Sequence, residues 1–225
     1  MGDAIGQMLA SAVGIAISPL PLIAVVLMLA TPRGRANGTA FTLGWMVTLV
    51  AITTAVILAG SGAGADDGGM PATWTHWLKL ALGVLFLLMG AKQWKDRPKE
   101  GEEHRLPGWM RAIDTFTPGK AAGLAALLSG ANPKNLVLAV GGAASIASSP
   151  ASGGGKTVAG ALFVVIGSLC ALLPLLVYVF GGARAPRVLG GWKAWMGEHN
   201  AAIMTVVLVV LGTKYVGDAI SGLTS

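Results

Sequence analysis

Long apolar runs without charged residues dominate this chain. A helix needs about 20 mostly apolar residues to cross the hydrocarbon core of a bilayer, and helices satisfy their own backbone polar groups, which lipid demands. Four stretches contain no Asp, Glu, Lys or Arg: residues 4–32, 36–65, 135–155 and 157–183. The pattern predicts an all-α integral membrane protein with six transmembrane helices, at residues 5–30, 38–60, 74–94, 119–147, 157–181 and 199–220.

Prolines interrupt two of the predicted spans. The first contains Ser18-Pro19-Leu20-Pro21, and the fourth contains Asn132-Pro133-Lys134-Asn135. A proline inside a helix removes a backbone donor and clashes with the preceding turn. In lipid, the freed carbonyls need partners in the protein or a water-lined cavity. Broken helices at corresponding places of two halves point to the binding site of a transporter, so we expect helices 1 and 4 to be broken and to carry such a site.

The two halves of the chain resemble each other beyond the breaks. When Pro19 is aligned with Pro133, both segments have small residues before the proline and branched aliphatic residues after it. The third and sixth spans end alike, at Leu88–Lys92 and Val210–Lys214. An odd number of spans per half inverts one half relative to the other, so the two breaks are expected to face each other near the midplane. The predicted organisation is two inverted three-helix repeats, 1–94 and 119–225, joined by a cytoplasmic linker at 95–118.

Composition and charge agree with a membrane protein and indicate its orientation. Charged residues make up 12% of the chain, against about 25% in an ordinary soluble domain. The predicted loop at 61–73 carries Asp66 and Asp67 but no basic residue. Lys and Arg favour cytoplasmic loops, so the net charge of +6 reflects topology with both termini outside, and no nucleic-acid partner is expected. Twelve of the 16 basic residues lie in the predicted inner loops: Arg33, Arg35, Lys92, Lys95, Arg97, Lys99, Arg105, Arg111, Lys120, Arg184, Arg187 and Lys193.

Lys134 is the strongest candidate for a functional residue, because apolar sequence lies on both sides of it. A lysine at the bilayer centre costs about 2.5–3.5 kcal/mol on insertion scales, so it is expected to face a cavity or a partner. It either attracts an anionic group such as a phosphate or carboxylate, or changes protonation during transport. Alternatively the fourth span begins later, and Lys134 extends to the inner face. Lys214, near one end of the sixth span, is expected to extend to the interface in that way.

The remaining residues of the breaks complete a candidate substrate-binding site. Side-chain and freed backbone atoms become ligands where helical hydrogen bonding is interrupted, and the helix that restarts after each proline presents a positive dipole end. The alternative is a purely structural kink, in which the Ser and Asn side chains hydrogen-bond to the freed backbone groups. Pro174 is expected to bend the fifth span, and glycines such as Gly44 to let helices pack closely. The candidate residues are Ser18, Pro19, Pro21, Asn132, Pro133, Lys134 and Asn135.

The sequence contains no pattern typical of an enzyme, a cofactor site or a metal site. Cys170 is the single cysteine, which excludes an intrachain disulfide and a Cys-X-X-Cys relay. The three histidines have no metal-ligand spacing, and phosphate loops and paired intramembrane carboxylates are absent. Gly167-Ser168 lacks a histidine-bearing span for a serine nucleophile. We therefore expect no catalysis, cofactor or metal.

Ser-Pro-Leu-Pro in the first span and Asn-Pro-Lys in the fourth resemble the lysine-exporter (LysE) superfamily. The chain is most similar to its GAP branch, the glycopeptidolipid- or sulfolipid-addressing proteins of actinobacteria. Amino-acid exporters of the superfamily carry Pro-Gly-Pro in the first span, where this chain has Leu20 in the middle position. The resemblance implies an exporter of the bacterial plasma (inner) membrane that helps to deliver glycolipids toward the cell surface.

The sequence and the resemblance together predict an exporter, or a flippase-like transporter, for a lipid or lipid-linked glycoconjugate. Its partners would be membrane lipids, the substrate, and a lipid-export machinery or further copies of the chain. Two alternatives stay open. One is export of a small solute, an amino acid or a cation, and the other is a non-transporting membrane subunit of a lipid-export machine.

Overall fold

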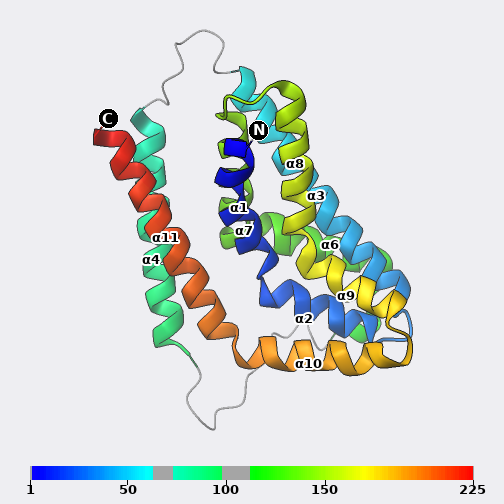
Figure 1. Cartoon of the computed structure of the whole chain (residues 1–225). Helices are drawn as coiled ribbons and strands as arrows, with labels where there is room; N and C mark the ends of the chain where they lie inside the picture. Colours follow the sequence, from blue (N-terminus) through cyan, green and yellow to red (C-terminus); the bar gives the residue numbers. More distant parts are fainter. Residues whose placement is uncertain (1, 63–72, 98–111, 225) are drawn as a thin grey trace. The chain divides into compact units, whose positions relative to one another are not determined.

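The computed structural model describes residues 2–62, 73–97 and 112–224, and within these ranges the regular structure is entirely helical (Figure 1). Asp66, Asp67 and most of the predicted linker lie outside the described residues. The long helices follow the apolar runs of the sequence. The elements are α1 (Gly2–Ala16), α2 (Pro19–Leu29), α3 (Gly34–Gly62), α4 (Thr73–Lys95), η1 (Ile113–Thr115), α6 (Pro118–Ala126), the π-helical η2 (Leu127–Ala131), α7 (Pro133–Ala147), α8 (Gly153–Gly167), α9 (Leu169–Phe180), η3 (Gly182–Arg184), α10 (Ala185–Glu198) and α11 (Asn200–Thr224).

Three helices begin with the same local signature, a small polar residue followed by proline. The pairs are Ser18-Pro19 for α2, Thr117-Pro118 for α6 and Asn132-Pro133 for α7. The first backbone N–H groups of a helix have no intrahelical acceptor, so proline loses nothing there, and its fixed φ favours the first turn. The breaks predicted from the prolines are therefore points where a helix restarts.

Long apolar helices make this chain a membrane-embedded protein. Among the described residues, α3 over 34–60 and α11 are each long and apolar enough to cross a bilayer. The α1–α2 pair and the α8–α9 pair also qualify if each is counted as one span, with bends of 50° and 63°. The structure thus supports two to four spans by length and composition, and the six-span inverted repeat stays a prediction.

The described helices form two compact units, which the two predicted repeats do not match one to one. In the larger unit, α1 packs on α7 and α8, while α2 packs on α9 and α10 (Figure 1). Its core includes Phe41 stacked on Trp45, with ring centroids 6.2 Å apart, and the buried Phe163. Each predicted repeat contributes helices to both units.

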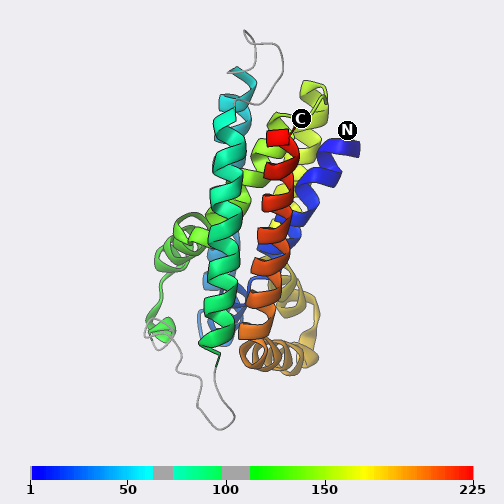
Figure 2. The same ribbon diagram turned by 90° about the vertical axis from the view of Figure 1, so that its left-hand side faces the viewer.

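The smaller unit is the pair α4 and α11, which lie side by side in both views (Figures 1 and 2). Gly83 and Gly212 make this approach close, because a Cβ added at either glycine would lie 3.0 Å from the backbone oxygen of the other. Phe86 and Tyr215 meet edge to face, with centroids 5.9 Å apart. Small residues at such contacts are the usual means by which membrane helices associate.

Candidate functional site

The two helix breaks lie against each other in the larger unit. Lys134, in the first turn of α7, donates from Nζ to Ser18 Oγ at 2.8 Å, across 116 positions of sequence. Ser18 Oγ in turn donates to Asn135 Oδ1 at 3.1 Å. All three side chains are buried, with 3% or less of their residue surface exposed. The two breaks are therefore in contact, as expected, and their position near the membrane midplane stays a prediction.

Lys134 also satisfies the end of α1. In a continuous helix the Gly14 carbonyl would accept from the N–H of Ser18, but Ser18 is extended and starts a new helix. Lys134 Nζ donates to the Gly14 carbonyl at 3.0 Å instead. A cation is favourable at this position, because the last carbonyls of a helix carry partial negative charge.

Asn135 hydrogen-bonds to a freed carbonyl at the second break, as Lys134 does at the first. The N–H of Asn132 donates to the carbonyl of Leu127 at 3.1 Å, and Pro133 has no N–H to give. The carbonyl of Leu128 accepts from Asn135 Nδ2 at 2.9 Å. One connected set of hydrogen bonds, here called the break network, therefore joins Lys134, Ser18 and Asn135 to both broken helices.

The other candidate residues shape the breaks without joining the break network. Asn132 caps α7, where its Oδ1 accepts from the backbone N–H of Lys134 at 3.1 Å. Pro19 and Pro21 are buried in the first turn of α2, and Pro133 is exposed at the start of α7. The structure therefore brings together three of the seven candidates and assigns the other four a role in backbone geometry.

A third break lies in the fifth predicted span, six residues before the predicted bend at Pro174. The fifth predicted span bends by 63° at Ser168, between α8 and α9, whereas Pro174 lies inside α9. The expectation of a bend at Pro174 is corrected, because the helical run ends six residues earlier. The freed carbonyl of Gly167 accepts from Trp45 Nε1 at 3.2 Å. The signal was present in the Gly167-Ser168 pair, since sharp kinks occur at Gly/Ser pairs as well as at proline.

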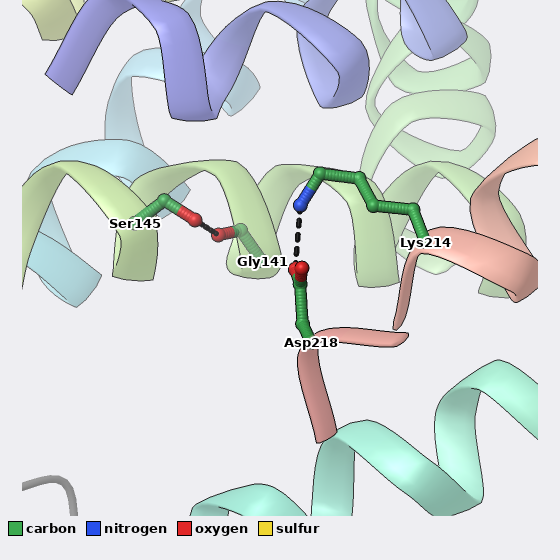
Figure 3. Close-up of polar contacts among 4 residues, drawn as sticks. All are labelled: Gly141, Ser145, Lys214 and Asp218. Carbon is green, nitrogen blue, oxygen red and sulfur yellow. Dashed lines mark hydrogen bonds and ion pairs between the residues drawn. The ribbon is translucent and has the colours of Figure 1, made fainter. Parts of the chain in front are cut away.

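A second polar feature lies in the smaller unit, on α11. Lys214 Nζ and Asp218 Oδ2 are 2.6 Å apart, one helical turn from each other, with side chains 37% and 44% exposed (Figure 3). The helix continues to Thr224, so Lys214 lies ten residues from its end, about 15 Å at 1.5 Å per residue. The expectation that Lys214 extends to the membrane interface stays a prediction. Figure 3 also shows the hydrogen bond that Ser145 donates within α7 to the Gly141 carbonyl.

Removing one member of this ion pair is expected to destabilise the protein more than removing both members. Asp218→Leu leaves the charge of Lys214 without its acidic partner in an apolar helix, and an unpaired charge within a membrane helix is unfavourable. The double variant Lys214→Leu/Asp218→Leu leaves no charge, so it is expected to be more stable than either single variant. Thermal unfolding of the four proteins in lipid nanodiscs measures the coupling as a double-mutant cycle. Additive effects of the two single changes would contradict the pairing.

The described residues offer no cluster of three or more His, Cys, Asp or Glu side chains placed to hold a metal ion. Chemically, the break network presents a buried ammonium group beside the N-terminal ends of α2 and α7. Both kinds of group favour anions.

The comparisons with known proteins are specific to one family. The family described as Sap, sulfolipid-1-addressing protein, matches residues 8–221, nearly the whole chain. No curated protein and no solved structure matches the chain.

Proposed function

Because the chain belongs to the family described as Sap, sulfolipid-1-addressing protein, we propose that it exports a lipid or lipid-linked glycoconjugate toward the cell surface. The observation that carries the proposal is the contact between the two helix breaks through Lys134 and Ser18, 2.8 Å apart. A transporter site is expected where two interrupted helices meet inside a membrane protein. The family name concerns the delivery of a lipid, which agrees with this interpretation.

The proposed mechanism uses the charge of Lys134 to recognise the head group. An anionic or polar head group would approach the break network from one side of the membrane, where the ammonium group and the starts of α2 and α7 favour negative charge. Head-group oxygens would then replace Ser18 Oγ or the Gly14 carbonyl as acceptors for Lys134. Exchange of these acceptors would couple substrate binding to movement between the two broken helices.

The proposed topology follows the sequence. The chain would cross the bacterial plasma membrane six times, as two inverted three-helix repeats with both termini outside. Alternating access would come from the two repeats moving against each other around the breaks. Membrane lipids would surround the chain, and a lipid-export machinery or further copies of the chain would be its protein partners. We propose no enzymatic activity.

A non-transporting subunit of a lipid-export machine is the second candidate. The completeness of the break network favours it, because the carbonyls of Gly14 and Leu128 and the side chain of Ser18 all find partners within the chain. Such a network holds two broken helices together without any substrate. This interpretation predicts that a purified chain in vesicles moves no lipid.

Lipid analysis of a deletion strain tests export. Surface and whole-cell lipids are compared between the deletion strain and the same strain carrying the wild-type chain. Export predicts a lipid that is lost from the surface, accumulates inside the cell and returns with the wild-type chain. An unchanged lipid profile would overturn lipid export. Reconstitution of the purified chain into vesicles then separates the transporter from the subunit.

A further inference from the structure

An apolar cavity of about 510 Å³ lies beside the first break in the larger unit. Helix α1 and the turn after it contribute Val13, Ala16 and Ile17 to the wall, and α2 contributes Leu22. The bend between α8 and α9 contributes Cys170 and Leu173, and α10 contributes Trp192 and Trp195. The volume falls within the range of about 300–1,000 Å³ that is usual for small-molecule sites.

The lining determines what the cavity can hold. Its side chains are aliphatic, aromatic or sulfur-containing, without a carboxylate, amide or basic group. A water molecule needs two to four polar partners, so cavities of this kind favour hydrocarbon. Val13, Leu173 and Trp195 are each more than 40% exposed, so the cavity is open at its edge.

The cavity and the break network share one turn of helix. Val13 and Ile17 line the cavity, while Gly14 and Ser18, each one position further along, bond to Lys134. A cationic polar site directly beside an apolar cavity is complementary to an amphiphile with an anionic head and a hydrocarbon tail.

We propose that this cavity binds one acyl chain of the transported lipid, next to the head group at the break network. The proposal rests on the proposed function for the identity of the lipid, and it adds a second site with its own residues and its own chemistry. Trp192 and Trp195 of α10 also line the cavity. Tryptophan is favoured where hydrocarbon meets the polar interface of a membrane.

Photo-crosslinking of the purified full chain in nanodiscs tests the acyl-chain site. The probe is a phosphatidylglycerol that carries a diazirine at the end of one acyl chain, and peptide mapping locates the adducts. We expect adducts to concentrate on the cavity segments of α1, α9 and α10. Adducts spread equally over outward apolar residues such as Val47 of α3 and Val206 of α11, which are 65% and 61% exposed, would overturn the proposal.

Two leucines of α9 provide a matched pair of variants. Leu173 lines the cavity and Leu176 does not, although they are 44% and 47% exposed. Leu173→Trp places a larger side chain in the cavity and is expected to lower adduct formation there about tenfold, a difference of about 1.4 kcal/mol in binding. Leu176→Trp is expected to leave it unchanged. Equal labelling of the two variants would also contradict the proposal, and the wild-type adduct map decides by itself if Leu173→Trp does not fold.

The crosslinking experiment and the export experiment test separate claims, so one claim can be wrong while the other stands. If the deletion strain loses a surface lipid but no adducts concentrate in the cavity, the acyl-chain site is wrong and lipid export stands. If adducts concentrate in the cavity but the deletion strain has a normal lipid profile, the site binds a chain and the proposed export is wrong.

Discussion

Replacing Lys134 with alanine is expected to reduce surface delivery of the exported lipid by tenfold or more. The change removes the positive charge of the break network and its contacts to Gly14 and Ser18, at 3.0 and 2.8 Å. A hydrogen bond from the charged Lys134 to a head-group oxygen would be worth about 1.5–3 kcal/mol, and about 1.4 kcal/mol corresponds to a factor of ten in binding. The measurement is the ratio of surface to whole-cell lipid in the deletion strain carrying each variant at equal level.

Lys156 provides the matched control for this variant. It also donates from Nζ to a backbone carbonyl at a helix end, that of Ala147 at 2.5 Å, but it lies outside the break network. Lys156→Ala is therefore expected to keep delivery close to wild type. Delivery by Lys134→Ala equal to that of Lys156→Ala would show that Lys134 does not anchor the substrate.

Ser18→Ala separates substrate binding from simple stabilisation of the breaks. It removes the hydroxyl between Lys134 and Asn135 but keeps the ammonium group. If Lys134 binds the head group, Ser18→Ala delivers more lipid than Lys134→Ala at equal amounts of folded protein. If the network only holds the helices together, delivery follows the amount of folded protein in both variants.

Gly44→Leu is expected to destabilise the larger unit by more than the usual cost of overpacking, which is about 1–3 kcal/mol. A Cβ at Gly44 of α3 would lie 2.7 Å from the carbonyl oxygen and 2.9 Å from the Cα of Ala122 in α6. Those atoms belong to the backbone, so they give way only if α6 moves away from α3. The measurement is the thermal unfolding midpoint of the purified chain in nanodiscs.

Gly123 is the control for the packing prediction, because it lies on α6 next to Ala122 and an added Cβ there would meet no atom within 4 Å. Gly123→Leu is expected to leave the unfolding midpoint nearly unchanged, and leucine favours the helix over glycine. Equal midpoints for the Gly44 and Gly123 variants would contradict the close approach of α3 and α6.

Local features of the fold could be predicted from the sequence because they depend on neighbouring residues. Charge-free runs of sufficient length specify helices that partition into lipid, and α3 and α11 follow such runs. Pro19 and Pro133 specify where a helix stops and restarts, because proline fixes φ and lacks an N–H. The restart at each proline therefore follows from residues next to one another in the chain.

Features that depend on distant residues required the tertiary structure. The bend at Ser168 has no proline, and its freed carbonyl is satisfied by Trp45, 122 positions away. The pairing of α4 with α11 as a separate unit takes one helix from each predicted repeat.

The sequence by itself determined that this is a helical membrane protein with two proline breaks, one of which carries a lysine. Only the tertiary structure decided that Lys134 meets Ser18 and the Gly14 carbonyl, and that an apolar cavity lies beside them. The physical reason is that backbone conformation is governed by local sterics and hydrogen-bonding capacity. The acceptor that a buried ammonium finds depends instead on how helices more than 100 residues apart pack together.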